Sequence, residues 1–161
     1  MSYSHTQPNS QPSNAGAADL FVDLNSDLLR NGRSVRFSAP GHSMYPTIRD
    51  GETLIVQPIE AARVAVGDII LHAVDQRLIA HRVVKIVNSK SLSAADAVCE
   101  FIFKADASSS LNEPVKPSQI LGKVVSIERN GTTIDPYGLK AKLACLPRLI
   151  FNHLKHALYK S

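Results

Sequence analysis

Residues 69–87 read IILHAVDQRLIAHRVVKIV, and this stretch decides the fold class. It contains two apolar, β-branched runs, residues 69–74 and 78–87, on either side of the pair Asp75-Gln76. Runs of this composition are typical of strands, and a two-residue polar break between them is typical of a hairpin. The stretch therefore predicts two antiparallel strands joined by a tight turn.

More short strands are predicted on both sides of this hairpin. Val35, Phe37 and Ala39 alternate with polar residues, as side chains do on a strand with one buried face. The other strand candidates are residues 53–56, 101–104 and 120–128. The pair Asn130-Gly131 predicts a turn, because both residues tolerate positive φ. Residues 88–100 are polar and are expected to form a surface loop or short helix. Together these patterns predict a mostly β domain over residues 19–135.

Different patterns are found at the two ends of the chain. Residues 1–18 contain almost no large apolar side chains, so burial cannot offset the entropy of ordering them, and a disordered leader is expected. Leu20, Phe21, Leu24 and Leu28 then fall near one face of a short helix. In residues 136–161 leucine or isoleucine recurs every three or four positions, which predicts an amphipathic helical tail that Pro147 kinks or splits.

Charge distribution excludes one class of function. The chain has 18 basic and 14 acidic residues, a net charge of +4, and residues 136–161 contain five basic residues and no acidic ones. The basic character therefore belongs to the tail, and a nucleic-acid-binding domain is not expected. The tail favours equally a helix packed on the domain and attachment to an anionic membrane surface through residues 139–161.

Neither a membrane span nor a metal site is expected. The chain has no run of about 18 apolar residues and no secretory signal at its start, which predicts a cytoplasmic or peripherally membrane-associated protein. Cys99 and Cys145 match no metal-ligand or redox spacing. We expect two buried free thiols, no metal and no cofactor, although a single disulfide is an alternative.

The candidate chemistry lies in residues 41–48, which read GHSMYPTI. A serine hydroxyl becomes a nucleophile only when it is sterically accessible and a nearby base takes its proton. Ser43 has Gly41 before it and Pro46 after it, which is typical of a rigid bend with little side-chain bulk. A simple turn has the same pattern, so the serine needs a partner elsewhere in the chain.

His81 is the candidate base. On a strand, Ile79, His81 and Val83 share one face, and the aliphatic neighbours favour the neutral imidazole, which accepts protons. Asp106 follows the strand candidate at residues 101–104, and a carboxylate there could orient the imidazole. A structural histidine and a turn aspartate are the alternatives. Lys85 is a rival base, but it lies four residues further on.

Five segments of the chain, taken in order, resemble the signal peptidase I family over about residues 35 to 130. They are GHSMYPTI at 41–48, VGDII at 66–70, IAHRVV at 79–84, KADA at 104–107 and ILGKV at 120–124. Eubacterial members usually have lysine where this chain has His81. The chain therefore resembles the serine–histidine branch that is typical of archaea and of the eukaryotic secretory system.

The resemblance implies a signal-peptidase-like β domain and a set of roles. Ser43 would be the nucleophile, His81 the general base and Asp106 the orienting acid, with the oxyanion and substrate positioned around Gly41 and Met44. Substrates would be extended peptides or proteins cut after small residues, through an acyl-enzyme. The chain departs from the family pattern in lacking a membrane-spanning helix and in having Ala105 where glycine precedes the acid.

Two other functions remain open at this point. One is a self-cleaving regulator of the phage-repressor type, which uses a serine–lysine pair. The other is a non-catalytic β domain that binds a peptide or partner, since one fold can serve unrelated functions.

Overall fold

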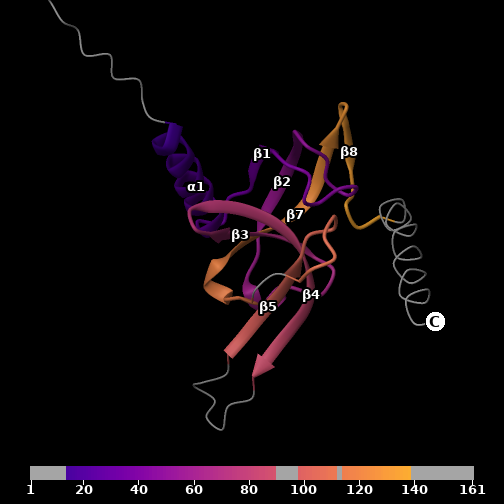
Figure 1. Cartoon of the computed structure of the whole chain (residues 1–161). Coiled ribbons are helices and arrows are strands. Elements are labelled where there is room, and N and C mark those ends of the chain that lie inside the picture. The colour runs from indigo at the N-terminus through magenta and orange to yellow at the C-terminus, as the bar shows by residue number, and fades with distance from the viewer. Residues whose placement is uncertain (1–13, 90–97, 112–113, 139–161) are drawn as a thin grey trace, which may run out of the picture.

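The computed structural model describes residues 14–89, 98–111 and 114–138, and it confirms a mostly β fold with a helix at the N-terminal side (Figure 1). The elements, in chain order, are α1 (Asn14–Arg30), β1 (Val35–Ala39), β2 (Glu52–Pro58), the 3-10 turn η1 (Ala61–Arg63), β3 (Ile69–Val74), β4 (Arg77–Ser89), β5 (Val98–Lys104), β6 (Pro114–Val115), the 3-10 turn η3 (Pro117–Gln119), β7 (Ile120–Arg129) and β8 (Thr132–Ile134).

The strands form one antiparallel sheet. Their order is β1-β2-β7-β3-β4-β5-β6, and β8 pairs with β7. The predicted hairpin is β3–β4, and its two turn residues Asp75 and Gln76 have φ values of 46° and 56°. Asn130 and Gly131 also have positive φ, and they join β7 to β8. Both turns predicted from the sequence are confirmed.

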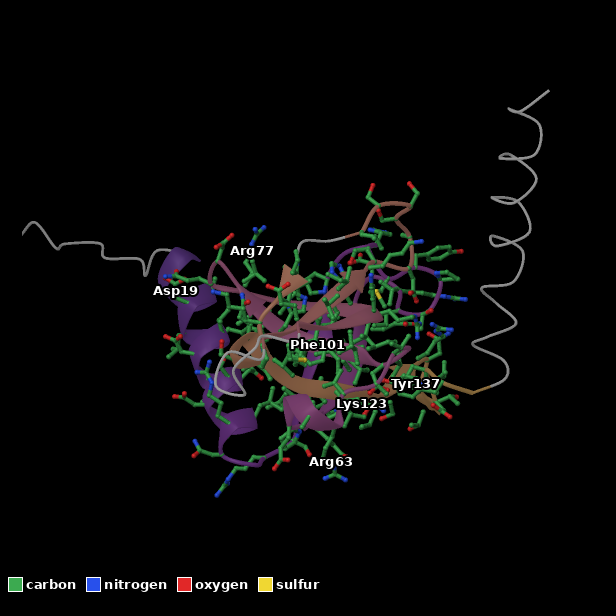
Figure 2. The ribbon with its side chains drawn as sticks, turned by 90° about the horizontal axis from the view of Figure 1, so that it is seen from below. Asp19, Arg63, Arg77, Phe101, Lys123 and Tyr137 are labelled. Atoms are coloured by element: carbon green, nitrogen blue, oxygen red, sulfur yellow. The ribbon has the colours of Figure 1, made fainter. Side chains whose placement is uncertain are left out.

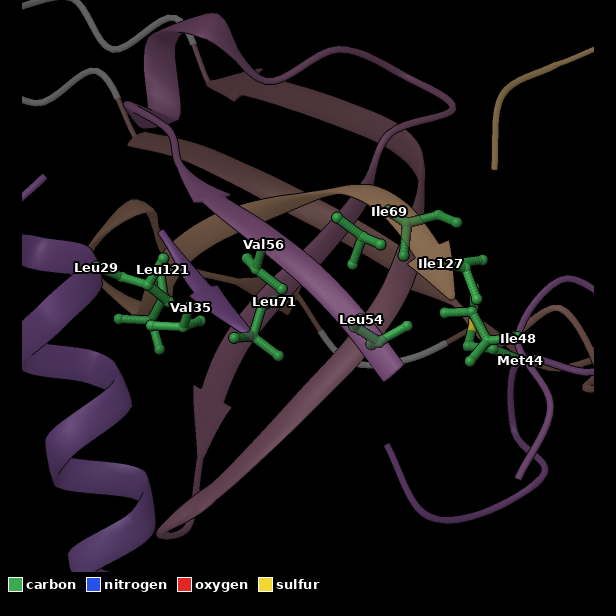
Figure 3. Packing of buried hydrophobic residues seen from close by; sticks show 11 residues of the cluster. Leu29, Val35, Met44, Ile48, Leu54, Val56, Ile69, Leu71, Leu121 and Ile127 are labelled. Carbon is green, nitrogen blue, oxygen red and sulfur yellow. The ribbon is translucent and has the colours of Figure 1, made fainter. Parts of the chain in front are cut away.

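The sheet has a hydrophobic cluster on each face. On β3, Ile69 and Leu71 belong to one cluster, and Ile70 between them belongs to the other, as strand alternation requires. The first cluster, drawn in Figure 3, contains Leu29, Val35, Met44, Ile48, Leu54, Val56, Ile69, Leu71, Leu121, Val124 and Ile127. The second contains Val64, Ile70, Val83, Phe101, Phe103, Val115 and Ile120.

Helix α1 packs against the first cluster through its C-terminal end. Leu29 is 2% exposed, whereas Leu20 and Leu24 nearer the start of the helix are 68% and 56% exposed. Gly122 on β7 allows this approach, because a Cβ there would lie 3.0 Å from the Leu29 side chain and 2.7 Å from the Gln57 carbonyl oxygen. A larger residue at position 122 would therefore push the helix or β2 away.

Tyr137, in the described segment after β8, lies at the end of the molecule away from α1 (Figure 2). The Tyr137 hydroxyl donates to the Val124 carbonyl oxygen at 2.7 Å and accepts from the Ile69 N–H at 3.1 Å. Lys123 lies over the Tyr137 ring and pairs with Asp68 at 2.6 Å. These contacts hold residues 135–138 against β7 and β3.

The prediction of a polar connection at residues 88–100 is wrong at both of its boundaries. Strand β4 continues to Ser89 and β5 begins at Val98, where Asn88 pairs with Cys99 and Ser89 with Val98. Backbone pairing in a long hairpin does not require apolar side chains, so the polar composition concealed it. Residues 90–97 lie outside the described residues.

Several other predictions concern residues that are only partly described. Helix α1 begins at Asn14, inside the predicted leader, and residues 1–13 lie outside the described residues. The predicted tail helix at 139–161, with Cys145, also lies outside them. Cys99 is a half-buried free thiol. Within the described ranges, no helix has the length and apolar character needed to cross a membrane.

Candidate active site

Ser43 lies in the loop between β1 and β2, and the loop is held in a fixed shape. The Gly41 N–H donates to the Asp50 carboxylate at 2.7 Å, and the Ile48 N–H donates to the Met44 carbonyl oxygen at 2.9 Å. Gly41 has a φ of 100°, which few residues other than glycine adopt. Met44 and Ile48 are each 4% exposed and insert into the first cluster (Figure 3). The loop is thereby anchored while Ser43 stays exposed.

The turn after β5 holds the same loop from the other side. The Ala107 N–H donates to the Ser43 carbonyl oxygen at 2.9 Å, and the Asp106 N–H lies 3.4 Å from the Met44 sulfur. The Thr47 hydroxyl donates to the Asp106 carboxylate at 2.6 Å. The segment predicted to supply an orienting acid therefore lies directly against the serine loop.

An ion pair holds the end of the serine loop that leads into β2. Arg129 on β7 forms a salt bridge with Glu52 at the start of β2, and it also donates to the Thr47 carbonyl oxygen at 3.1 Å. The Glu52 carboxylate in turn accepts from the Arg49 N–H at 2.8 Å. The backbone of the serine loop is thus tied to the sheet at both of its ends.

His81 lies on β4, paired with Ile70 of β3, and it is 9% exposed. Burial lowers the pKa of His81 below its ordinary value of 6.5, and the negative charge of Asp106 opposes this effect in part. His81 is therefore neutral at neutral pH, which is the form that can accept a proton.

Ser43 and His81 line the same cavity, which has a volume of about 340 Å³. Gly41 and Met44, the other two residues predicted for the site, line it as well. The remaining lining residues are all apolar: Phe37, Ala39, Pro40, Ile48, Leu54, Leu71, Leu78, Ile79 and Ala80. The fold thus places four of the five predicted site residues around one largely apolar hollow.

Asp106, the fifth predicted residue, is not among the lining residues. Its carboxylate forms a two-point ion pair with Arg82, at 2.9 Å to Nε and 2.7 Å to Nη2, and accepts from Thr47. Its side chain is 10% exposed and that of Arg82 is 23% exposed. The acid acts on His81 through its charge, and it also joins β4 to the serine loop.

Arg82 and Thr47 were missed from the sequence, although one signal was present. Strand alternation places Arg82 on the face opposite His81, and a cation on a partly buried strand face requires a counter-charge. Arg82 also donates to the Gly67 carbonyl oxygen at 2.9 Å, which holds the turn before β3. Which acid would pair with Arg82 could not be read from the sequence.

Lys85, the rival base, is turned away from His81. Simple alternation would put His81, Val83 and Lys85 on one face, but the β4–β5 register shifts between Val83 and Lys85. Val83 pairs with the buried Phe103, whereas Lys85 pairs with Ile102, which points to the other face. Lys85 is exposed and does not line the cavity.

Other hollows in the molecule contain different chemistry. The space between the end of α1, η1 and β7, about 680 Å³, has Arg30, Arg63 and Lys123 in its lining and no serine, cysteine or histidine. Among the described residues, no group of three or more histidine, cysteine, aspartate or glutamate side chains is arranged to hold a metal ion. Of these two cavities in the described part of the chain, the one with Ser43 and His81 contains the side chains that nucleophilic chemistry requires.

Comparison with known proteins identifies the family of the chain. The family model described as Peptidase S24-like matches residues 6–125, which include β1 to β5, the serine loop and His81. No curated protein and no solved structure matches the chain. A serine-protease-like domain that takes a peptide or protein substrate follows from the family match.

Proposed function

The chain belongs to the Peptidase S24-like family, and from this premise we propose that it is a serine endopeptidase of the signal-peptidase type. Ser43 is the nucleophile and His81 is the general base. The observation that carries the proposal is that an exposed serine on an anchored loop and a buried, neutral histidine line one cavity. These are the two groups that acyl transfer requires.

The reaction would follow the serine–histidine pattern. The Ser43 hydroxyl attacks the peptide carbonyl while His81 takes its proton, and His81 then gives that proton to the leaving amine. Water, activated by the same imidazole, hydrolyses the acyl-enzyme. The negative oxygen of the intermediate would be held by backbone N–H groups around Ser43, since Gly41 has no hydroxyl to contribute.

An extended peptide suits the surroundings of the cavity. Strand β1 is at the end of the sheet and pairs with β2 alone among the described strands. Residues 78–81 of β4 pair only with β3 there, because pairing with β5 starts at Arg82. The cavity is lined from both strands. A substrate segment could add as a strand along either edge, with its side chains in the apolar hollow.

We propose that Asp106 acts mainly as a positioning residue, and not only as the acid that orients His81. Its carboxylate pairs with Arg82 beside His81 and accepts from Thr47 in the serine loop. Asp106 would therefore fix the distance between nucleophile and base, and its charge would favour the imidazolium that forms during acylation. This proposal keeps the acid at the site while assigning most of its effect to positioning.

A serine-reactive fluorophosphonate is expected to label Ser43 at neutral pH. Because burial holds the pKa of His81 below 6.5, the labelling rate should stay constant down to about pH 6.5 and then fall as His81 takes up a proton. The rate would be measured by mass spectrometry of the intact protein between pH 8 and 4.

The matched control is Ser110→Ala, which removes an exposed serine in the turn after β5. Labelling of this variant should equal that of the wild type. Complete inertness of the well-folded wild-type protein at every pH would contradict the proposal and would favour a non-catalytic peptide-binding domain.

We also propose that residues 139–161 attach the enzyme peripherally to an anionic membrane surface. The support is the sequence of the tail, whose basic residues lie among regularly spaced leucines. The chain is expected to bind phosphatidylserine-containing vesicles in a flotation assay and to lose binding when residues 139–161 are deleted. Equal binding of the full-length and shortened proteins would disprove the attachment.

A further inference from the structure

A second histidine, His72 on β3, is buried beside the candidate base. It is 2% exposed, and neither of its ring nitrogens has a hydrogen-bond partner among the described residues. A polar group buried without a hydrogen-bond partner loses its interactions with water and gains none in return, which destabilises the folded state. An apolar aromatic residue would fill the same space without that cost. The presence of histidine at position 72 therefore suggests that its ring nitrogens have a function.

Strand register puts His72 and His81 on one face of the sheet. His72 pairs with Ile79, and Ile70, two residues earlier on β3, pairs with His81. The two imidazoles are therefore diagonal neighbours, with ring centroids 6.1 Å apart and planes inclined by 52°. The His72 ring also stacks on Phe103 of β5, with centroids 4.6 Å apart and planes within 11° of parallel. This stack holds His72 next to the base.

The surroundings keep His72 uncharged at neutral pH. Burial, and to a smaller extent a positive charge on His81, lower the pKa of His72 to about 4. The charged groups acting on the pair are Asp106, which raises the pKa of His81, and Arg82, which binds Asp106. The facing residues of the neighbouring strands, Ile70, Ile120 and Phe103, do not titrate.

We propose that His72 is a positioning residue for the reaction assigned above to Ser43 and His81, on which this inference rests: its neutral imidazole stabilises the positive charge that His81 acquires. The proton that leaves the Ser43 hydroxyl goes to His81 and returns from there to the leaving group, and none passes to His72. A ring nitrogen with a free lone pair is an electrostatic partner for an imidazolium, whereas a phenyl ring at that place supplies packing alone.

The first test compares His72→Phe with His72→Gln. Phenylalanine retains an aromatic ring against Phe103 but removes both nitrogens, and glutamine restores a polar acceptor that does not titrate. His72→Phe should lower kcat about tenfold, which corresponds to about 1.4 kcal/mol, without changing KM, because His72 does not line the cavity. His72→Gln should recover part of the loss. Equal kcat values for His72→Phe and the wild type would overturn the proposal.

The second test needs no enzymatic activity, so it separates failure of this inference from failure of the proposed function. The pKa of His81, followed by NMR of the imidazole resonances in the full chain, should be lower in His72→Phe than in the wild type. In the wild type itself, protonation of His81 should shift the ring ¹⁵N resonances of His72. An unchanged His81 pKa, or His72 resonances that do not respond, would refute the coupling even if peptidase activity is found, and the wild-type measurement remains decisive if the variant does not fold.

Discussion

Replacing Ser43 or His81 by alanine is expected to abolish peptide cleavage, with kcat falling by on the order of a million-fold for either change. The two losses should be equal and should not add in the double variant, since nucleophile and base act as one unit. Ser43 is exposed, so Ser43→Ala should change the free energy of unfolding by less than about 0.5 kcal/mol. Cleavage of a peptide library by the purified full chain would measure the loss of kcat, and thermal unfolding would measure the change in stability.

Controls make this result specific. Ser110→Ala and Lys85→Ala change exposed residues that do not line the cavity, and both variants should cleave like the wild type. If Ser43→Ala still cleaves, Ser43 is not the nucleophile. If Lys85→Ala loses cleavage, Lys85 rather than His81 is the base. An internal cut of the chain itself, seen by intact mass and lost in Ser43→Ala, would instead indicate a self-cleaving regulator.

Replacing Arg82 by methionine is expected to cost about 3 to 5 kcal/mol of unfolding free energy, because it leaves the largely buried Asp106 carboxylate without its cation. Methionine retains much of the apolar stem of arginine, so packing changes little. The Thr47 hydroxyl also donates to this carboxylate, but it is neutral and cannot replace the cation. Chemical denaturation of both proteins at pH 7 would give the difference.

The matched control is Arg36→Met, which breaks the ion pair between Arg36 and Glu128. The side chains of that pair are 64% and 31% exposed, so solvent screens the interaction and its loss should lower the unfolding free energy far less than Arg82→Met does. The double variant Arg82→Met/Asp106→Asn should recover part of the stability by removing the uncompensated charge. If Arg82→Met is no less stable than Arg36→Met, the ion pair between Arg82 and Asp106 does not hold the serine loop to β4.

Much of the architecture could be predicted from local patterns. The β3–β4 hairpin follows from two β-branched runs around Asp75-Gln76, and the final turn follows from Asn130-Gly131, because few residue pairs adopt positive φ at both positions. Strand alternation also placed Ile79, His81 and Val83 on one face correctly: Val83 belongs to the second cluster, His81 pairs with Ile70 of that cluster, and Ile79 pairs with His72 on the same face. These features depend on residues close in sequence, which is why they could be read directly.

The boundaries of β4 and β5 could not be predicted in the same way. Asn88, Ser89 and Val98 belong to strands because their backbones pair across the hairpin, and that pairing leaves no mark on side-chain composition. The bulge after Val83 is a similar case. It turns Lys85 away from the base, although alternation alone would have placed the two together.

The sequence by itself determined the strand-forming runs and the turns, because each is written in short-range residue order, and the family resemblance added Ser43 and His81 as candidate nucleophile and base. Only the tertiary structure decided that Ser43 and His81 line one cavity, that Asp106 binds Arg82 and Thr47, and that His72 lies beside the base. These are contacts between strands far apart in the chain. Their partners are set by sheet register and burial, which a single linear pattern does not specify.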